Sequence, residues 1–280
     1  MHDTWSWLSG ILAPQGPIAA SELKILLNAT AIMLAVIVPV IVLTLGFAWW
    51  FRVGNKNAQR LPNWSYSGRI ELVIWSIPTL IVVFLGGIAW LGSHDLDPYR
   101  EIQSKTPPLT VQVVSLDWKW LFIYPDKNLA SVNQLVLPAS TPVNFQLTSA
   151  SVMNSFFVPQ LGSQIYTMAG MTTRLSLQAD RTGIFPGISA QFSGAGFSDM
   201  RFDVVVKSGD DFEAWVNTTR QSKSVLDQTG FARLARQSSN VAPATFAGVE
   251  PRLFDTIVAG TAHAPDAQAM QSNQMPSAGE

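Results

Sequence analysis

Two long stretches without a charged side chain constrain the fold of this chain more than any other feature. Residues 25–51 and 72–92 contain no Asp, Glu, Lys or Arg. As α-helices they would extend about 40 Å and about 31 Å, whereas the hydrocarbon layer of a bilayer is about 30 Å thick. Helices buried in a soluble core are the alternative, but such cores rarely contain uncharged runs of this length. The sequence therefore predicts a two-helix transmembrane hairpin over residues 25–92, with membrane lipid as a partner.

The charges that flank these stretches predict their orientation. The basic residues of the intervening loop, residues 52–71, are Arg52, Lys56, Arg60 and Arg69. The outer flanks, residues 1–24 and 93–107, together carry only Lys24, Arg100 and Lys105. Because loops rich in Lys and Arg stay in the cytoplasm, we expect the loop there and both ends of the chain outside. In a bacterium this predicts a multi-pass protein of the inner (cytoplasmic) membrane, whose N-terminal segment 1–24 and C-terminus are periplasmic.

Composition excludes several classes of site. The chain has no Cys, and its formal net charge is −1 at pH 7. Disulfides and thiolate metal sites are therefore impossible, and no basic field or glycine-rich phosphate loop favours nucleic acid. The three His residues are scattered along the chain: His2, His94 and His263. A metal site rich in nitrogen or sulfur is close to excluded.

From residue 107 to residue 207 the pattern changes to short β-rich runs with a period of two. The runs are separated by Pro, Gly, Asn or Asp, and they read LTVQVVS, WKWLFIY, VNQLVLP, VNFQLTS, TRLSLQA and MRFDVVV. Such runs are typical of strands, so residues 107–207 are predicted to form a compact antiparallel sandwich or barrel.

The C-terminal part, residues 208–260, has the pattern of short helices. DDFEAWVNTTRQS predicts a helix capped by Asp210 or Asp211. The apolar residues on one face of this helix are Phe212, Trp215 and Val216. VLDQTGFARLARQ predicts a second, weaker helix. Residues 261–280, rich in Ala, Gln, Ser and Pro, lack periodicity and are expected to be disordered.

The stretch GISAQFSGAGFSDM, residues 187–200, has the uneven spacing of a metal-binding loop. The residues that carry this spacing are Ser189, Gln191, Ser193, Phe197 and Met200. Only the methionine thioether could bind a soft metal, and alone it is too weak to hold one. The residues by themselves leave two alternatives open, an ordinary loop of a β-domain or a site that has lost its metal.

Several segments resemble subunit II of the haem–copper respiratory oxidases. SLDWKWLFIYPD and SVMNSFFVPQLGSQIYTMAGM are similar to the start and the middle of that family's exported domain, and the stretch 187–200 resembles its metal loop. The likeness covers residues 20–260 and is closest to the quinol oxidase branch of the bo type. It implies two N-terminal transmembrane α-helices followed by an all-β cupredoxin-like (Greek-key) periplasmic domain with short C-terminal helices.

In the cytochrome c oxidases of that family, the metal loop holds a dinuclear copper centre. The resemblance puts Asn154 and Phe197 at the positions of its two His ligands, Ser189 and Ser193 at its two Cys, and Gln191 at its Glu; Met200 alone is retained. Hydroxyl, amide and phenyl groups cannot replace bridging thiolates and imidazoles. We therefore expect no copper or other cofactor in this chain, a Met200 that packs in the core, and a Trp118 that is an aromatic contact residue rather than an electron acceptor.

The resemblance also implies what the assembled complex does. A chain without this copper cannot accept electrons from cytochrome c. The electron donor is therefore expected to be ubiquinol, oxidised at a site in a partner, subunit I. The haems and copper that reduce O2 to water would lie in subunit I as well, with proton translocation across the membrane. Subunits III and IV complete the expected set of partners, and this subunit would be structural.

Glu71, in SGRIELVIW at the start of the second apolar stretch, has two interpretations, one from the residues and one from the resemblance. From the residues alone it is a solvated carboxylate at a helix N-terminus, where an anion is favourable. In the family, the corresponding Glu lies at the mouth of a proton path that enters subunit I. The resemblance therefore predicts that Glu71 is a residue at which protons enter.

Two rival functions remain at this point. Subunit II of a cytochrome c oxidase would need the cysteines that this chain lacks. A non-enzymatic membrane-tethered β-domain, such as a copper chaperone or assembly factor, would show a cluster of Met and His in the exported domain. Residues 107–207 contain no His, and their methionines are spread out: Met153, Met168, Met171 and Met200.

Overall fold

The computed structural model describes residues 10–59, 62–63, 65–222 and 224–260. The chain divides into two compact units, the hairpin Ser21–Asp97 and a β-rich unit that joins the residues before Ser21 to those after Asp97. The predictions made for Arg60, for the first nine residues and for a disordered tail at 261–280 lie outside the described residues.

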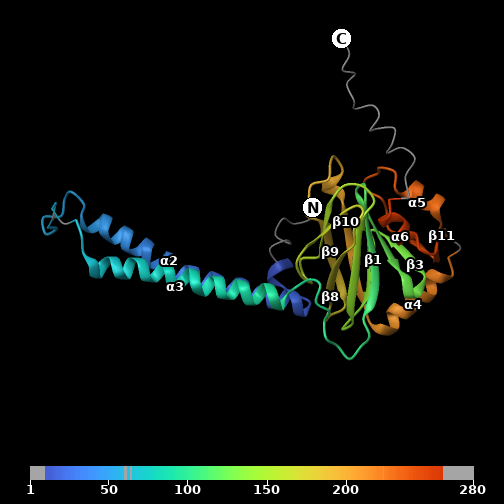
Figure 1. Ribbon diagram of the computed structural model, residues 1–280, viewed down its shortest axis with the longest axis horizontal. Coiled ribbons are helices and arrows are strands. Elements are labelled where there is room, and N and C mark those ends of the chain that lie inside the picture. Colours follow the sequence, from blue (N-terminus) through green and yellow to red (C-terminus); the bar gives the residue numbers. More distant parts are fainter. Residues whose placement is uncertain (1–9, 60–61, 64, 223, 261–280) are drawn as a thin grey trace, which may run out of the picture. The chain divides into compact units, whose positions relative to one another are not determined.

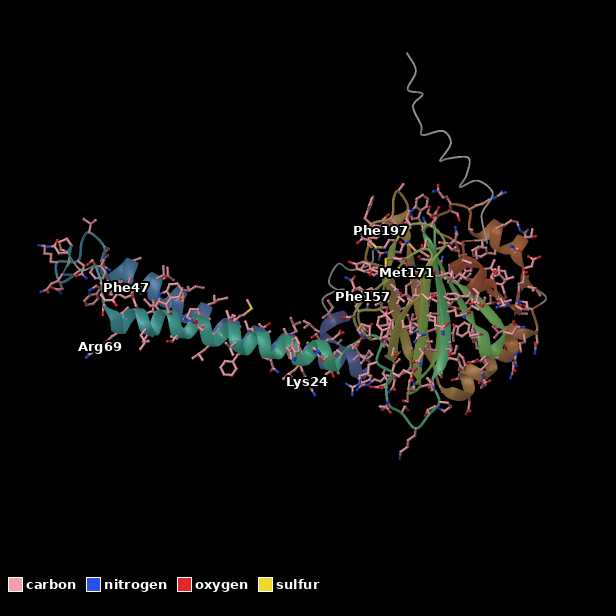
Figure 2. The ribbon with its side chains drawn as sticks, viewed as in Figure 1. Lys24, Phe47, Arg69, Phe157, Met171 and Phe197 are labelled. Carbon is pink, nitrogen blue, oxygen red and sulfur yellow. The ribbon has the colours of Figure 1, made fainter. Side chains whose placement is uncertain are left out.

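The hairpin consists of two helices, α2 (Pro17–Trp50) and α3 (Gly68–Asp95), each long and apolar enough to cross a membrane. Both begin several residues before the uncharged stretches, and Pro17 occupies the first helical position, where its missing N–H costs nothing. The two helices meet at Gly92, where an added Cβ would lie 2.7 Å from Cδ1 of Ile25. Lys24 and Arg69 lie toward opposite ends of the hairpin (Figure 2).

The β-rich unit is a sandwich of two sheets with a small third sheet (Figure 1). The larger sheet has the order β12 (Ala244–Phe246), β3 (Leu129–Val132), β2 (Lys119–Tyr124), β1 (Leu109–Leu116), β5 (Pro142–Ser149) and β8 (Thr173–Gln178). The second sheet has the order β4 (Gln134–Pro138), β10 (Arg201–Lys207), β9 (Gly183–Ser189), β6 (Asn154–Phe157) and β7 (Ile165–Thr167). The third pairs β11 (Val225–Leu226) with β13 (Gly248–Val249).

Two features of the sandwich differ from the sequence prediction. The sheets are not wholly antiparallel, because β1 pairs with β5 and β4 with β10 in parallel. The predicted strand VNQLVLP is also divided between two sheets. Asn133 interrupts it with a left-handed backbone (φ 54°), a conformation that Asn adopts more readily than most residues.

The larger sheet is buried on both faces. One face packs on the second sheet through Trp120, Phe122 and Tyr124, and the other packs on the C-terminal segment through Leu121 and Ile123. Every residue of β2 is therefore buried, although a strand with one solvated face would alternate. Figure 1 shows α5 and α6 beside β3, on the side of the sheet away from β9 and β10.

The C-terminal helices are α4 (Gly209–Arg220), α5 (Gln228–Leu234) and α6 (Leu253–Val258). The prediction that Asp210 or Asp211 caps α4 is wrong. Ser208 is the cap, because its hydroxyl oxygen accepts the backbone N–H of Asp211 at 3.2 Å. The second predicted helix begins later than expected, since Val225 and Leu226 form β11 and Asp227 caps α5.

Residues 10–20, which we call the N-terminal strap, fold onto the β-rich unit. The backbone N–H of Gln15 donates to the carbonyl of Gln160 at 2.8 Å, and the N–H of Asp180 donates to the carbonyl of Gln15 at 2.8 Å. Ile18 packs against the core between the two sheets. The segment that precedes the first helix is therefore bonded to the domain that follows the second.

Candidate functional site

Two of the former ligand positions, Asn154 and Ser189, lie at neighbouring strand ends. Asn154 opens β6 and Ser189 closes β9, and the two side chains are 0% and 4% exposed. The Ser189 hydroxyl lies 3.1 Å from Oδ1 of Asn154 and 3.3 Å from the carbonyl oxygen of Gln191, so it can donate to either. A hydrogen bond between protein groups therefore joins two positions that the family uses as metal ligands.

Ser193 and Met200, two further positions of the set, form a second contact. Met200 is buried, as predicted, and its Sδ lies 3.9 Å from the Ser193 hydroxyl, which donates to it. The backbone carbonyl of Met200 accepts the N–H of Ser189 at 3.1 Å, which links this contact to the first. The thioether thus has a hydroxyl partner and a place in the core.

Phe197 is the one position of the set that takes no part in these hydrogen bonds. It begins the short 3₁₀ helix η2 (Phe197–Asp199), is half-buried, and is labelled in Figure 2. Its ring lies edge-on to Phe192, with centroids 5.6 Å apart, and Phe192 is 72% exposed. Where the family has a ligand, this chain therefore has an aromatic pair at the surface.

Trp118 holds the loop in shape. Its backbone is left-handed (φ 64°), and its indole N–H donates to the carbonyl of Ser193 at 3.0 Å. The indole lies so close to Gly196 that an added Cβ would be 2.6 Å from Cγ of the ring. The sequence predicts that Trp118 is a contact residue but does not predict its partner. The glycines in GAG, which leave room for the ring, are the signal that indicates one.

Lys119 was not singled out by the sequence, yet it is buried beside this loop, with 1% of its surface exposed. Its ammonium donates to the carbonyls of Asp117 at 3.1 Å and Arg236 at 2.7 Å and to the hydroxyl of Ser238 at 2.7 Å. Burial lowers the pKa of Lys119, and the nearby Asp117 carboxylate opposes that shift. The three bonds satisfy the three protons and tie the C-terminal segment to the β1–β2 turn.

These residues do not fit a dinuclear copper centre. The donors are amide and hydroxyl oxygens and one thioether, whereas such a centre needs thiolates and imidazoles. Protein groups already form hydrogen bonds with the side chains of Asn154, Ser189 and Ser193. None of these polar side chains therefore lacks a partner that a ligand would have to supply. Among the described residues, the one buried side-chain nitrogen or oxygen without a partner is Nε1 of Trp120, and no three His, Asp or Glu gather as a metal site.

Glu71 belongs to the hairpin, whereas the loop residues belong to the β-rich unit. It lies in the first turn of α3, exposed, and its backbone N–H donates to the carbonyl of Ser67 at 3.0 Å. It is one of the residues that line an open hollow of about 560 Å³ on α3: Gly68, Glu71, Leu72, Trp75, Ser76, Thr79 and Leu80.

The fold and the loop define a class, a cupredoxin-like domain whose loop lacks thiolate and imidazole ligands, preceded by a hairpin of two helices that are long and apolar enough to cross a membrane. Residues 87–208 match the family described as cytochrome c oxidase subunit II, periplasmic domain, and residues 220–263 match the COX aromatic-rich motif. Identity is 49% to cytochrome bo(3) ubiquinol oxidase subunit 2 of Pseudomonas aeruginosa, over 91% of this chain and 77% of that protein. The corresponding protein of Pseudomonas putida is 48% identical over 89% and 79% of the two chains.

A third relative, ubiquinol oxidase subunit 2 of Acetobacter aceti, is 49% identical over 89% of this chain and 81% of that protein. The chain belongs to the family of ubiquinol oxidase subunit 2. The resemblance found in the sequence and the predicted cupredoxin-like fold are thereby confirmed.

Proposed function

We propose that this chain is subunit II of a respiratory ubiquinol oxidase complex that oxidises ubiquinol, reduces O2 to water and translocates protons. The observation that carries the proposal is the degenerate loop. Its hydrogen bonds between Ser189 and Asn154 and between Ser193 and Met200 replace a metal centre, so a water-soluble one-electron donor such as cytochrome c has no acceptor here. The names of the relatives support the same activity.

The subunit itself would then have a structural role. The haems and the copper of the complex would lie in the partner subunit I, where ubiquinol is oxidised, and subunits III and IV would complete the assembly. Among the described residues of the hairpin, Ser21–Asp97, no side chain is buried within this chain and most are exposed. A face of this extent suits contact with partner helices as well as with lipid.

The N-terminal strap supports the proposed topology. Its hydrogen bonds to Gln160 and Asp180 require residues 10–20 and the β-rich unit to lie on the same side of the membrane. The basic residues between α2 and α3 favour the cytoplasm. We therefore place the strap and the domain in the periplasm of a bacterium and the connecting loop in the cytoplasm.

We also propose that Glu71 is a residue at which protons enter the complex. It lies in the first turn of α3, after the basic loop, and so places a carboxylate at the end of the helix that we assign to the cytoplasm. The hollow that it lines offers room for water or for polar groups of a partner subunit. A carboxylate at such a position can take a proton from solvent and release it toward the membrane interior.

The complex purified in mild detergent tests the activity. We expect haem absorption, O2 consumption with ubiquinol, and none with reduced cytochrome c. A colourless chain that purifies alone would favour the membrane-tethered alternative. O2 consumption with cytochrome c would contradict the conclusion that the loop holds no copper.

Variants of the same complex test Glu71. Glu71→Gln removes the charge at nearly constant shape and should lower turnover and proton uptake, whereas Glu71→Asp should retain part of both. Unchanged turnover and pumping in Glu71→Gln would refute this role.

A further inference from the structure

The end of the hairpin where α2 and α3 are connected carries positive charge that no acid balances. The chain has no Asp or Glu between Glu22 and Glu71, whereas Arg52, Lys56 and Arg69 lie in the connection and at the start of α3. None of these three side chains forms an ion pair within the described part of the chain. Glu71 lies two positions after Arg69 on a helix, and side chains two apart do not face each other. The hairpin therefore presents cations that its own residues do not neutralise.

Two of these cations flank an ordered turn at the end of α2. The side chain of Asn55 donates from Nδ2 to the carbonyl of Trp50 at 2.7 Å, and its Oδ1 accepts the backbone N–H of Asn57 at 3.1 Å. The backbone N–H of Asn55 also donates to the carbonyl of Arg52 at 3.0 Å. Asn55 therefore fixes the backbone between Arg52 and Lys56, so the two charges are presented from one turn.

Exposed aromatic rings adjoin the cations. The guanidinium carbon of Arg52 lies 4.7 Å from the ring centroid of Trp49, a cation–π contact. Trp49 and Trp50 are 63% and 48% exposed, and Figure 2 shows Arg69 at the same end of the hairpin as Phe47 of α2. Trp side chains favour the boundary between hydrocarbon and headgroups, because the ring is apolar and its N–H is polar. The contact with Trp49 therefore holds the Arg52 guanidinium at the depth of the lipid headgroups.

We infer that Arg52, Lys56 and Arg69 bind the phosphate group of an anionic phospholipid, whose acyl chains lie against Trp49. An acidic protein surface would also neutralise the cations, but it would not match the exposed indoles or the fully exposed Val53 beside them. A ligand that is anionic at one end and apolar at the other matches both. On the proposed topology this surface meets the cytoplasmic leaflet, whose anionic lipids attract basic residues next to a membrane span. The inference does not depend on the proposed role of Glu71 or on the activity of the complex.

The experiment titrates the full chain, purified in mild detergent, with phosphatidylglycerol or with phosphatidylcholine of the same acyl chains. Native mass spectrometry counts the lipid molecules retained by each chain. We expect the parent chain to retain phosphatidylglycerol in preference to phosphatidylcholine. Arg52→Gln, Lys56→Gln and Arg69→Gln should each weaken phosphatidylglycerol binding by about fivefold and leave phosphatidylcholine binding unchanged. Because the chain is in detergent, the effect of these basic residues on membrane orientation does not enter the measurement.

Lys24→Gln is the matched control, since it removes the same charge from an exposed side chain toward the opposite end of the hairpin. It should leave the affinity for phosphatidylglycerol unchanged. A loss equal to that of Arg52→Gln would show that binding follows net charge alone and would overturn the inference. Arg52→Lys retains the charge and should bind phosphatidylglycerol more tightly than Arg52→Gln; equal weakening in the two variants would also overturn it.

A salt series on the parent chain keeps the test decisive if a glutamine variant does not accumulate. Raising ammonium acetate from about 0.1 M to about 1 M shortens the screening length from about 10 Å to about 3 Å, so phosphatidylglycerol binding should weaken and phosphatidylcholine binding should not. Phosphatidylglycerol binding that is insensitive to salt would overturn the inference. Equal retention of the two lipids, with assembly of the complex lost in the glutamine variants, would also overturn it and would assign the cations to an acidic surface of a partner subunit.

Discussion

Substitution of Gly196 by Ala tests whether Trp118 maintains the metal loop in the absence of a metal. Gly196 is buried, and the new Cβ would lie 2.6 Å from both Cγ and Cε3 of the Trp118 indole. Carbon atoms in favourable contact are about 3.5–4.0 Å apart, so the overlap is about 1 Å. The ring cannot simply withdraw, because its N–H is bonded to the carbonyl of Ser193.

The magnitude follows from the two ways in which the clash can be relieved. If the loop shifts, overpacking costs about 1–3 kcal/mol. If the indole leaves instead, it loses a hydrogen bond worth about 1 kcal/mol together with its contacts on the core. Either way we expect the β-rich unit to lose about 2 kcal/mol of unfolding free energy, which corresponds to a fall in Tm of about 4–8 °C.

The assay is urea and thermal unfolding of the full chain in mild detergent, followed by circular dichroism of the β-rich unit. Gly209→Ala is the control, because no atom lies within 4 Å of the new Cβ and the site is the first residue of α4. It should be neutral or stabilising by about 0.4–1 kcal/mol.

A double mutant identifies the cause. In a Trp118→Ala background the ring is absent, so Gly196→Ala should cost less than about 0.5 kcal/mol. The reasoning is refuted if Gly196→Ala behaves like Gly209→Ala, or if its cost is the same with and without the indole.

Four further outcomes follow from the structure. Ser189→Ala leaves Oδ1 of Asn154 buried without its donor and should lower the free energy of unfolding in urea by about 1–3 kcal/mol. Burial raises the pKa of Tyr124 above its ordinary value of 10.0, so the folded state keeps a proton that the unfolded chain loses; stability should fall as pH rises above 10, and Tyr124→Phe should flatten that fall. Gly16→Ala would press a Cβ onto the carbonyl oxygen of Gln178 and should release the N-terminal strap, seen as faster proteolysis. Added Cu²⁺ should give neither purple colour nor a spin-coupled signal in the β-rich unit, and chelators should leave its Tm unchanged.

Sequence patterns predicted the elements whose causes are local. Long uncharged runs predicted α2 and α3, and short runs rich in β-branched and aromatic residues predicted β1, β2, β4, β5, β8 and β10. The predicted runs do not include β6, β7, β9 or β12, nor the division at Asn133, since each depends on which neighbouring strand accepts the backbone N–H and C=O groups. β2 was predicted from its composition, but the alternation of buried and exposed residues is absent there because both of its faces are covered.

The candidate site, too, was predictable only where its features are local in sequence. Spacing and resemblance identified the positions of the former ligands, and chemistry alone excluded copper. Neither could predict that the Ser189 hydroxyl would bond to Asn154, 35 residues away, or that Lys119 would reach Arg236, 117 residues away. Such partners depend on the assembled fold. In the sequence alone, nothing about Lys119 indicates that its ammonium is buried.

The N-terminal strap imposes an order on biogenesis. The amide of Gln160 that bonds to the carbonyl of Ala13 lies 147 residues further along the chain. At about 5–20 residues per second, a ribosome needs roughly 7–30 s to make that interval. For that interval the strap is without the residues that bond to it. On the proposed topology the strap therefore reaches the periplasm well before the rest of the β-rich unit can fold onto it.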